Sequence, residues 1–196
     1  KFMTFRKEKK IKLSYYELNK IKAYLLDNGM SSLYPKRKIN SQYFDTKNLK
    51  MFQDSEEGVL PRKKIRVRWY FEQKYFLEKK ISSIEGRFKQ SKEINQNFYN
   101  DMKTVGYLDK DYGLIFPILT VSYERSYFDY KKMRITFDEN IEYSADDYFN
   151  YMNKKDFESV LEIKTSFNTP DDYILKEFSH IDSRFSKYCR GVLALR

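Results

Sequence analysis

The sequence predicts an α+β fold built on an antiparallel sheet. Several segments alternate charged with apolar residues, which is the pattern of strands whose two faces meet different surroundings. Three helix-forming segments are interspersed among these strands, and no repeat or low-complexity linker interrupts them. We therefore expect residues 1–196 to form a single domain.

The N-terminal part is predicted to run from strand to helix and back to strand. Ser14 and Glu17 have the spacing of a capping box, apolar residues then recur at helical spacing, and Gly29 ends the run. These signals predict one helix between residues 14 and 29. Around it we expect a strand over residues 2–13, a short strand over 40–46 and a connection over 47–60.

The most informative strand is RKKIRVRWY, residues 62–70. Its alternate positions carry the cations Arg62, Lys64, Arg66 and Arg68, and the residues between them include Ile65, Val67 and Trp69. Because successive side chains of a strand point to opposite faces, one face is cationic and the other apolar.

The second half of the chain repeats the pattern of strands and isolated helices. Thr169 is followed by Pro170, which suits the first helical position, and by Asp172, which completes a capping box. These residues predict the start of the third helix. The predicted elements are strands over 75–81, 118–130 (one strand or a pair), 133–143 and 159–165, a polar turn over 82–90, and helices over 91–105 and 169–180.

The charge of the chain points to a polyanionic partner. The formal net charge is +10, from 38 Lys and Arg against 28 Asp and Glu, which suits nucleic acid, an anionic membrane surface or phosphate-rich small molecules. The predicted strands together give one charged face, on which cations outnumber carboxylates about three to one. Its residues are Arg6, Glu8, Lys10, Arg62, Lys64, Arg66, Arg68, Glu78, Lys80, Arg125, Arg134, Glu162 and Lys164. Two like charges about 6 Å apart repel by roughly 3 kcal/mol at an effective dielectric near 20, so a bound polyanion would stabilise such a face. The alternative is the solvated face of a half-buried sheet.

Other features narrow the class of protein. There is no apolar run of about 18 residues to span a membrane, and the N-terminus does not read as a secretory signal. The single cysteine, Cys189, excludes an intramolecular disulfide and is expected to be buried and inert. The single histidine, His180, is expected to be structural. We expect a cytoplasmic domain, and the missing initiator Met suggests that it belongs to a longer protein.

Eight short motifs follow one another along nearly the whole chain. They are R-x-E-x-K at residues 6–10, YFDT at 43–46, RVR at 66–68, FLEKK at 76–80, YERSYF at 123–128, RITFD at 134–138, VLEIK at 160–164 and FSKYCRGV at 185–192. In order and spacing this set resembles the VTC domain, the catalytic domain of polyphosphate polymerases in the CYTH-like superfamily of triphosphate tunnel metalloenzymes.

The resemblance implies a fold and an activity. The expected fold is a closed antiparallel β-tunnel, or barrel, with a basic lumen and helices packed on the outside. The expected reaction transfers the γ-phosphate of ATP to a growing polyphosphate chain with Mn²⁺ or Mg²⁺. ATP and polyphosphate or triphosphate are therefore the expected partners. No nucleic acid is expected, and association with the cytoplasmic face of a membrane is expected only through segments outside this chain.

The resemblance also implies the site residues. The catalytic positions are Lys10, Arg66, Arg68, Lys80, Arg125, Arg134 and Lys187. Further phosphate ligands are Arg6, by motif, and Arg62, Lys64 and Lys164, by strand alternation. Glu162 is the expected metal ligand, and Glu8 is either a second one or the ion-pair partner of a neighbouring lysine.

One departure bears on the reaction. Hydrolases of the superfamily typically carry E-x-E-x-K, where this chain has Arg6 in place of the first acid. The loss of one carboxylate favours the polymerase branch over a two-metal triphosphatase. A tunnel triphosphatase acting on inorganic or nucleoside triphosphate, and a non-catalytic polyphosphate-binding module, are the alternatives.

Overall fold

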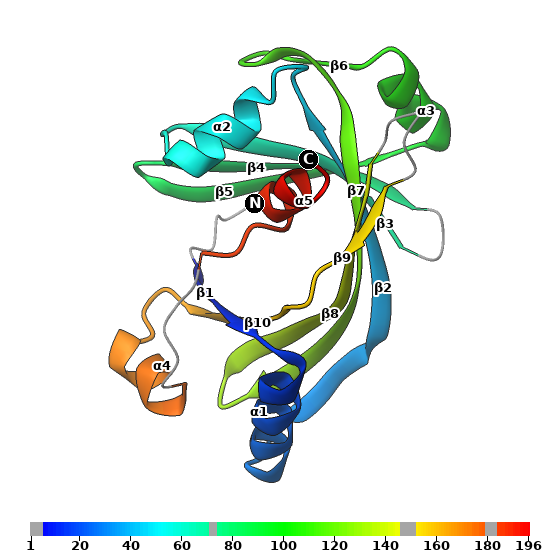
Figure 1. Cartoon of the computed structure of the whole chain (residues 1–196). Coiled ribbons are helices and arrows are strands. Elements are labelled where there is room, and N and C mark those ends of the chain that lie inside the picture. The colour runs from blue at the N-terminus through cyan, green and yellow to red at the C-terminus, as the bar shows by residue number, and fades with distance from the viewer. Residues whose placement is uncertain (1–5, 71–73, 146–151, 179–183) are drawn as a thin grey trace. The chain divides into compact units, whose positions relative to one another are not determined.

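The computed structural model describes residues 6–70, 74–145, 152–178 and 184–196, with only the backbone of Arg6 (Figure 1). The chain forms two compact units. Unit 1 comprises Lys1–Arg37, Tyr123–Ile141 and Asp156–Phe185, and unit 2 comprises Lys38–Ser122, Glu142–Lys155 and Ser186–Arg196. The long strands β2 (Ser31–Asp45), β7 (Gly113–Tyr130) and β8 (Met133–Ala145) have residues in both units.

Unit 1 is an antiparallel sheet with a helix-covered apolar face. Its strands include β1 (Arg6–Leu13) and β10 (Ser159–Ser166), and its helices are α1 (Tyr15–Asp27) and α4 (Asp171–Glu177). The hydrogen-bonded order is β1-β10-β8-β7. Ile11, Leu161 and Phe137 project from one face of this sheet and form a buried core with Leu18 and Leu25 of α1.

The start of α1 confirms the predicted capping box. Ser14 Oγ accepts a hydrogen bond from the Glu17 backbone N–H at 3.3 Å, and the Glu17 carboxylate accepts one from the Ser14 N–H at 2.8 Å. Two backbone donors that the helix leaves without partners are satisfied in this way.

Unit 2 contains the strand order β7-β2-β3-β4-β5. Its other elements are β3 (Arg62–Trp69), β4 (Tyr75–Ser83), β5 (Gly86–Ile94), β6 (Tyr107–Asp109), β9 (Asn153–Lys155), α2 (Lys50–Glu57), α3 (Gln96–Thr104) and α5 (Lys187–Ala194). The short strands β6 and β9 pair with β7 and β8.

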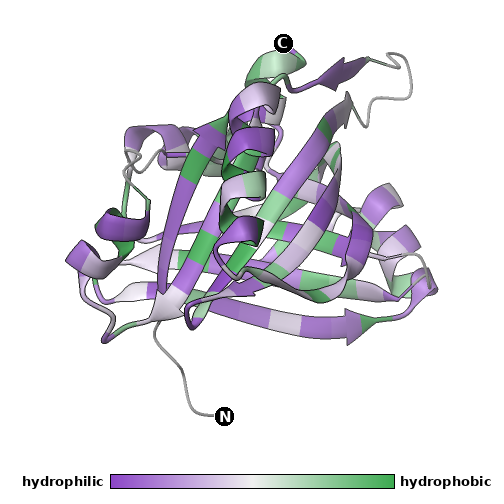
Figure 2. Ribbon diagram, turned by 90° about the horizontal axis from the view of Figure 1, so that it is seen from below, coloured by the Kyte–Doolittle hydropathy of each residue, from purple (hydrophilic) through white to green (hydrophobic). Residues whose placement is uncertain are grey.

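The apolar face of β3 packs against helices, as its alternation predicts. Ile65 and Val67 are fully buried in a cluster with Met51 of α2 and with Tyr99 and Met102 of α3. Figure 2 shows the same alternation of hydrophilic and hydrophobic positions along the strands. The arginines of β3 therefore lie on its opposite face.

The α+β class with an antiparallel sheet is confirmed, but several predicted boundaries were wrong. Residues 86–94 form β5 instead of a turn and a helix start, so the helix begins at Gln96. The predicted connection holds α2, the predicted strand over 40–46 begins at Ser31, and the C-terminus holds α5. In α4, Pro170 is the N-cap residue instead of the first helical residue.

Two remaining expectations concern single residues and membrane helices. Cys189 is buried, as expected, and burial raises the pKa of its thiol. His180 lies outside the described residues. No helix within the described part of the chain is long and apolar enough to cross a membrane.

Candidate phosphate-binding clusters and metal ligand

The strand register of unit 1 gathers the predicted residues of three segments. Glu8 of β1 lies opposite Lys164 of β10, and Lys10 lies opposite Glu162. Lys164 in turn lies opposite Arg134 of β8. Since paired residues of adjacent strands share a face, these side chains form one surface, which we call the Glu162 cluster.

Glu162 is a buried carboxylate surrounded by cations. Its side chain is 6% exposed, with Oε1 at 2.5 Å from Lys164 Nζ and Oε2 accepting a hydrogen bond from Arg125 Nη2 at 3.4 Å. Burial alone would raise the pKa of Glu162, but the charges of Arg125, Lys164 and Lys10 hold that pKa well below its ordinary value. Glu162 is therefore an anion at neutral pH and able to ligate a cation.

Arg125 is held in place by a second buried acid. Its Nε and Nη2 donate to the two carboxylate oxygens of Asp138 at 2.5 and 2.6 Å. Such a two-point contact fixes the plane of a guanidinium group. Asp138 is fully buried, and Nη2 of the guanidinium group that it holds also donates to Glu162.

Glu8 forms an ion pair with Lys10, which is one of the two roles predicted for it. Its Oε1 lies 3.1 Å from Lys10 Nζ, which also donates to the carbonyl oxygen of Phe185 at 3.4 Å. Among the residues that the structure describes, no group of three or more His, Cys, Asp or Glu side chains gathers as a metal cage. One or two carboxylates fit Mg²⁺ or Mn²⁺ when phosphate oxygens supply further ligands.

The remaining predicted residues of unit 1 lie on its strands. Arg134 is exposed on β8, with its guanidinium carbon 5.5 Å from the centre of the Tyr127 ring. Arg6 lies opposite Ser166 in the strand register, and its side chain is outside the described residues.

A second cluster, the Arg66 cluster, lies on β2, β3, β4 and β5 of unit 2. Arg66 donates from Nε and Nη2 to the same oxygen of Glu78, at 2.8 and 2.6 Å. Its third nitrogen, Nη1, donates to the hydroxyl of Tyr43 at 2.8 Å. Arg66 is 8% and Glu78 is 4% exposed, so this arrangement is nearly enclosed.

Glu78 serves two further cations. Its Oε1 lies 2.5 Å from Lys89 Nζ, and its Oε2 lies 3.8 Å from Arg68 Nη1. Arg68 is also fixed by a hydrogen bond from Nε to Ser41 Oγ at 3.2 Å. Burial alone would raise the pKa of Glu78, but Arg66, Arg68 and Lys89 lower it to about 2.

Three lysines that the sequence predicts to bind phosphate also belong to the Arg66 cluster, namely Lys64, Lys80 and Lys187. Lys64 of β3 lies opposite Lys80 of β4, and Lys64 Nζ donates to Ser186 Oγ at 2.8 Å. Ser186 is the N-cap of α5, whose first residue is Lys187. Burial would raise the pKa of Tyr43, but Arg66, Arg68 and Lys187 together lower it.

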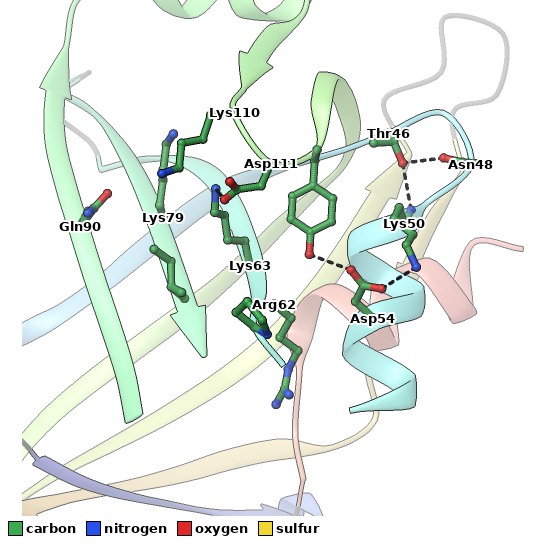
Figure 3. Close-up of a pocket in the computed structure, with 13 residues that line it drawn as sticks. Thr46, Asn48, Lys50, Asp54, Arg62, Lys63, Lys79, Gln90, Lys110 and Asp111 are labelled. Atoms are coloured by element: carbon green, nitrogen blue, oxygen red, sulfur yellow. Dashed lines mark hydrogen bonds and ion pairs between the residues drawn. The ribbon is translucent and has the colours of Figure 1, made fainter. Parts of the chain in front are cut away.

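The hydrogen bonds of Arg62 lie outside the Arg66 cluster. It donates from Nη1 to the carbonyl oxygens of Gly58 and Val59, and it lines a cavity whose lining includes none of the cluster (Figure 3). Most charges of that cavity pair with one another, as Lys50 does with Asp54 at 2.8 Å. Its predicted role as a phosphate ligand stays a prediction.

Sequence reasoning gave no site role to four residues that organise these clusters. They are Tyr43, Glu78, Lys89 and Asp138. Strand periodicity predicts that Glu78 and Asp138 share a face with the predicted cations, but it does not indicate that they orient the arginines. Lys89 lies in the segment that the sequence predicts as a turn, so periodicity does not assign it to a face.

The sequence model of the VTC domain matches residues 5–196. A putative adenylate cyclase from Bacillus halodurans aligns at 14% identity and TM-score 0.60, over 91% of this chain and 92% of that one. A Hippeastrum structure, titled a putative adenylyl cyclase that reveals a dominant triphosphatase activity, aligns at 15% identity and TM-score 0.58, over 97% and 96%.

The structural likeness extends to a third protein and concerns the fold alone. A putative adenylate cyclase from Vibrio parahaemolyticus aligns at 12% identity and TM-score 0.55, over 95% of this chain and 98% of that one. No curated protein gave a significant match.

Proposed function

The chain belongs to the VTC domain family, with the fold of the triphosphate tunnel proteins, and from that premise we propose that it is a polyphosphate polymerase domain. Members of the superfamily act on triphosphate groups and generally use divalent metals. In the proposed reaction, ATP donates its γ-phosphate to the end of a polyphosphate chain.

One observation carries the proposal: Glu162 is a buried carboxylate that lies among the cations Arg125, Lys164 and Lys10. Asp138 already fixes the plane of Arg125 through two hydrogen bonds, so the charge of Glu162 is not needed for that purpose. A carboxylate beside Arg125 and Lys164 is useful when a metal ion must be held next to phosphate oxygens.

The phosphoryl transfer requires the side chains mainly to position the substrates and to stabilise negative charge. An oxygen of the terminal phosphate attacks the γ-phosphorus of ATP, a new P–O–P bond forms, and the bond to the β-phosphate oxygen breaks to release ADP. The attacking phosphate is already ionised at neutral pH, so no side-chain base is required. Beside the candidate metal ligand, Arg125, Lys164 and Lys10 stabilise charge on the transferring group and on the leaving diphosphate.

Glu162, with Glu8 as the second candidate, would hold the divalent ion. When bound, Mn²⁺ or Mg²⁺ supplies positive charge to the phosphate oxygens. Arg125, fixed by Asp138, and Lys164 then keep the Glu162 carboxylate ionised and oriented.

The test is incubation of the purified protein with ATP and Mn²⁺, followed by gel electrophoresis with a stain for long phosphate chains. A ladder or smear that a polyphosphatase removes is the expected result. Consumption of ATP with release of orthophosphate and no chains would overturn the polymerase assignment.

A second candidate function is that of a triphosphatase. It is favoured by the likeness to the Hippeastrum protein, which is described as having a dominant triphosphatase activity. Against it stands Arg6, which replaces the first acid of the hydrolase motif. The gel separates the two candidates. A non-catalytic binder would leave ATP intact while tripolyphosphate still raised its melting temperature.

A further inference from the structure

We infer that Glu78 is a positioning residue, which fixes Arg66 and Arg68 in the orientation that receives phosphate. The inference rests on the proposed function, since it concerns how the Arg66 cluster binds its substrate. It assigns a role to an acid that lies among the predicted phosphate ligands without being one of them.

The contacts of Arg66 define its orientation. Two of its nitrogens donate to Glu78 Oε2, at 2.8 and 2.6 Å, so Glu78 engages one edge of the guanidinium group. Tyr43 accepts from the third nitrogen at 2.8 Å. Contacts on both sides leave the plane of this group little freedom, and a charged fork held in place binds phosphate with less loss of entropy.

The position of Glu78 in the sheet explains why it reaches several cations. Glu78 lies opposite Arg66 on one side and opposite Ser91 of β5 on the other. Lys89, two residues before Ser91 on the same face of β5, comes within 2.5 Å of Oε1. Arg68, two residues after Arg66, comes within 3.8 Å of Oε2.

Burial distinguishes Glu78 from an ordinary surface ion pair. Its side chain is 4% exposed, and the side chains of Arg66 and Arg68 are 10% and 8% exposed. Exposed ion pairs hold their partners only weakly, whereas a pair shielded from water and formed through several hydrogen bonds is rigid. The low pKa of Glu78, about 2, keeps the carboxylate charged at every pH where the protein would act.

Two effects of removing this carboxylate have opposite signs. If Glu78 only neutralised charge, Glu78→Gln would leave the cluster more positive and tighten its binding of anions. If Glu78 positions the arginines, the same change frees both side chains and weakens binding. The direction of the change in affinity therefore decides between the two roles.

The experiment measures tripolyphosphate affinity by calorimetry at fixed ionic strength. We expect Glu78→Gln to weaken binding about tenfold, as for loss of a hydrogen bond to a charged group, and Glu78→Asp to recover most of the loss. The matched control is Glu93→Gln, which removes an exposed acid on β5 and should leave affinity unchanged. Unchanged or tighter binding by folded Glu78→Gln would overturn the inference.

A second readout follows the orientation of Arg66 directly. Its Nε–H resonance, assigned by its loss in Arg66→Lys, should exchange slowly with water in the unmodified protein and in Glu78→Asp. It should exchange rapidly in Glu78→Gln. If Glu78→Gln does not fold, the unmodified protein carries the test: rapid exchange of its Arg66 Nε–H with water would show that Glu78 does not hold the guanidinium group, and would overturn the inference.

Failure of this inference is distinguishable from failure of the proposed function. An unmodified protein that binds tripolyphosphate but makes no chains contradicts the polymerase, while the binding difference still decides the role of Glu78. An unmodified protein that does not bind tripolyphosphate contradicts both.

Discussion

The hydroxyl of Tyr188 donates a hydrogen bond of 2.5 Å to Asp45 Oδ2, across 143 residues of sequence. The same carboxylate accepts from the backbone N–H groups of Met51 and Phe52, both at 2.9 Å, at the start of α2. The ring of Tyr188 stacks on Tyr43 with centroids 5.1 Å apart. Asp45 therefore ties together α2, α5 and the strand that carries Tyr43.

The bond between Tyr188 and Asp45 is expected to stabilise unit 2. Tyr188→Phe keeps the stacked ring but removes the donor, so we expect the free energy of unfolding to fall by about 2 kcal/mol. Urea unfolding should show a lower midpoint with an unchanged slope. Tyr16→Phe, at a tyrosine that is 74% exposed, is the control and should change nothing. A midpoint unaltered by Tyr188→Phe would contradict this role.

Glu162→Gln should separate catalysis from binding. The amide keeps the shape of the side chain but loses the charge that would hold a metal ion, so we expect the rate of ATP consumption to fall by about 100-fold or more. Tripolyphosphate should still raise the melting temperature. Glu142→Gln, at a carboxylate that is 44% exposed on β8, is the matched control. Full activity of Glu162→Gln would remove the metal assignment.

Arg68 is expected to contact phosphate. Arg68→Gln should weaken tripolyphosphate binding by about tenfold or more, because hydrogen bonds between charged groups are the strong ones. Arg87→Gln removes the same charge from an exposed position on β5 and should have little effect at moderate salt. Equal losses in the two variants would mean that total charge, and not this position, governs binding.

Glu78 should make the stability of the protein depend on acid pH. Its pKa is about 2 in the folded chain against an ordinary value of 4.5, so its contribution is complete above pH 4.5 and is lost as the pH falls toward 2. A shift of this size corresponds to about 3 kcal/mol. The difference in unfolding free energy between the unmodified protein and Glu78→Gln should therefore shrink between pH 5 and pH 3. A difference independent of pH over this range would show that Glu78 is not stabilised by its cations.

Strand periodicity predicted much of the fold and of the candidate site. It placed Arg66 and Arg68 on one face of β3 and Ile65 and Val67 on the other, because alternation is a property of the strand alone. The capping box of Ser14 and Glu17 could also be predicted, because it depends only on two residues that are three positions apart.

The errors arose where the sequence pattern was weak. The strand β5 is mostly polar and exposed, as suits the last strand in the hydrogen-bonded order, so nothing apolar alternates along it. The helix α5 is short, and part of its anchorage comes from Asp45, far away in the sequence. The pairings of Glu78 with Lys89 and of Arg125 with Asp138 depend on strand order, which periodicity does not give.

The measurement that tests the polymerase most directly follows the two ends of ATP separately. ATP labelled with ³²P at the γ-phosphate and with ³H in the adenine is incubated with the protein and Mn²⁺, and the products are separated by chain length. If the chain is a polyphosphate polymerase, ³²P enters chains that a polyphosphatase digests, while ³H remains in ADP. Recovery of all ³²P as orthophosphate, or of ³H in a cyclic nucleotide, would contradict the polymerase assignment.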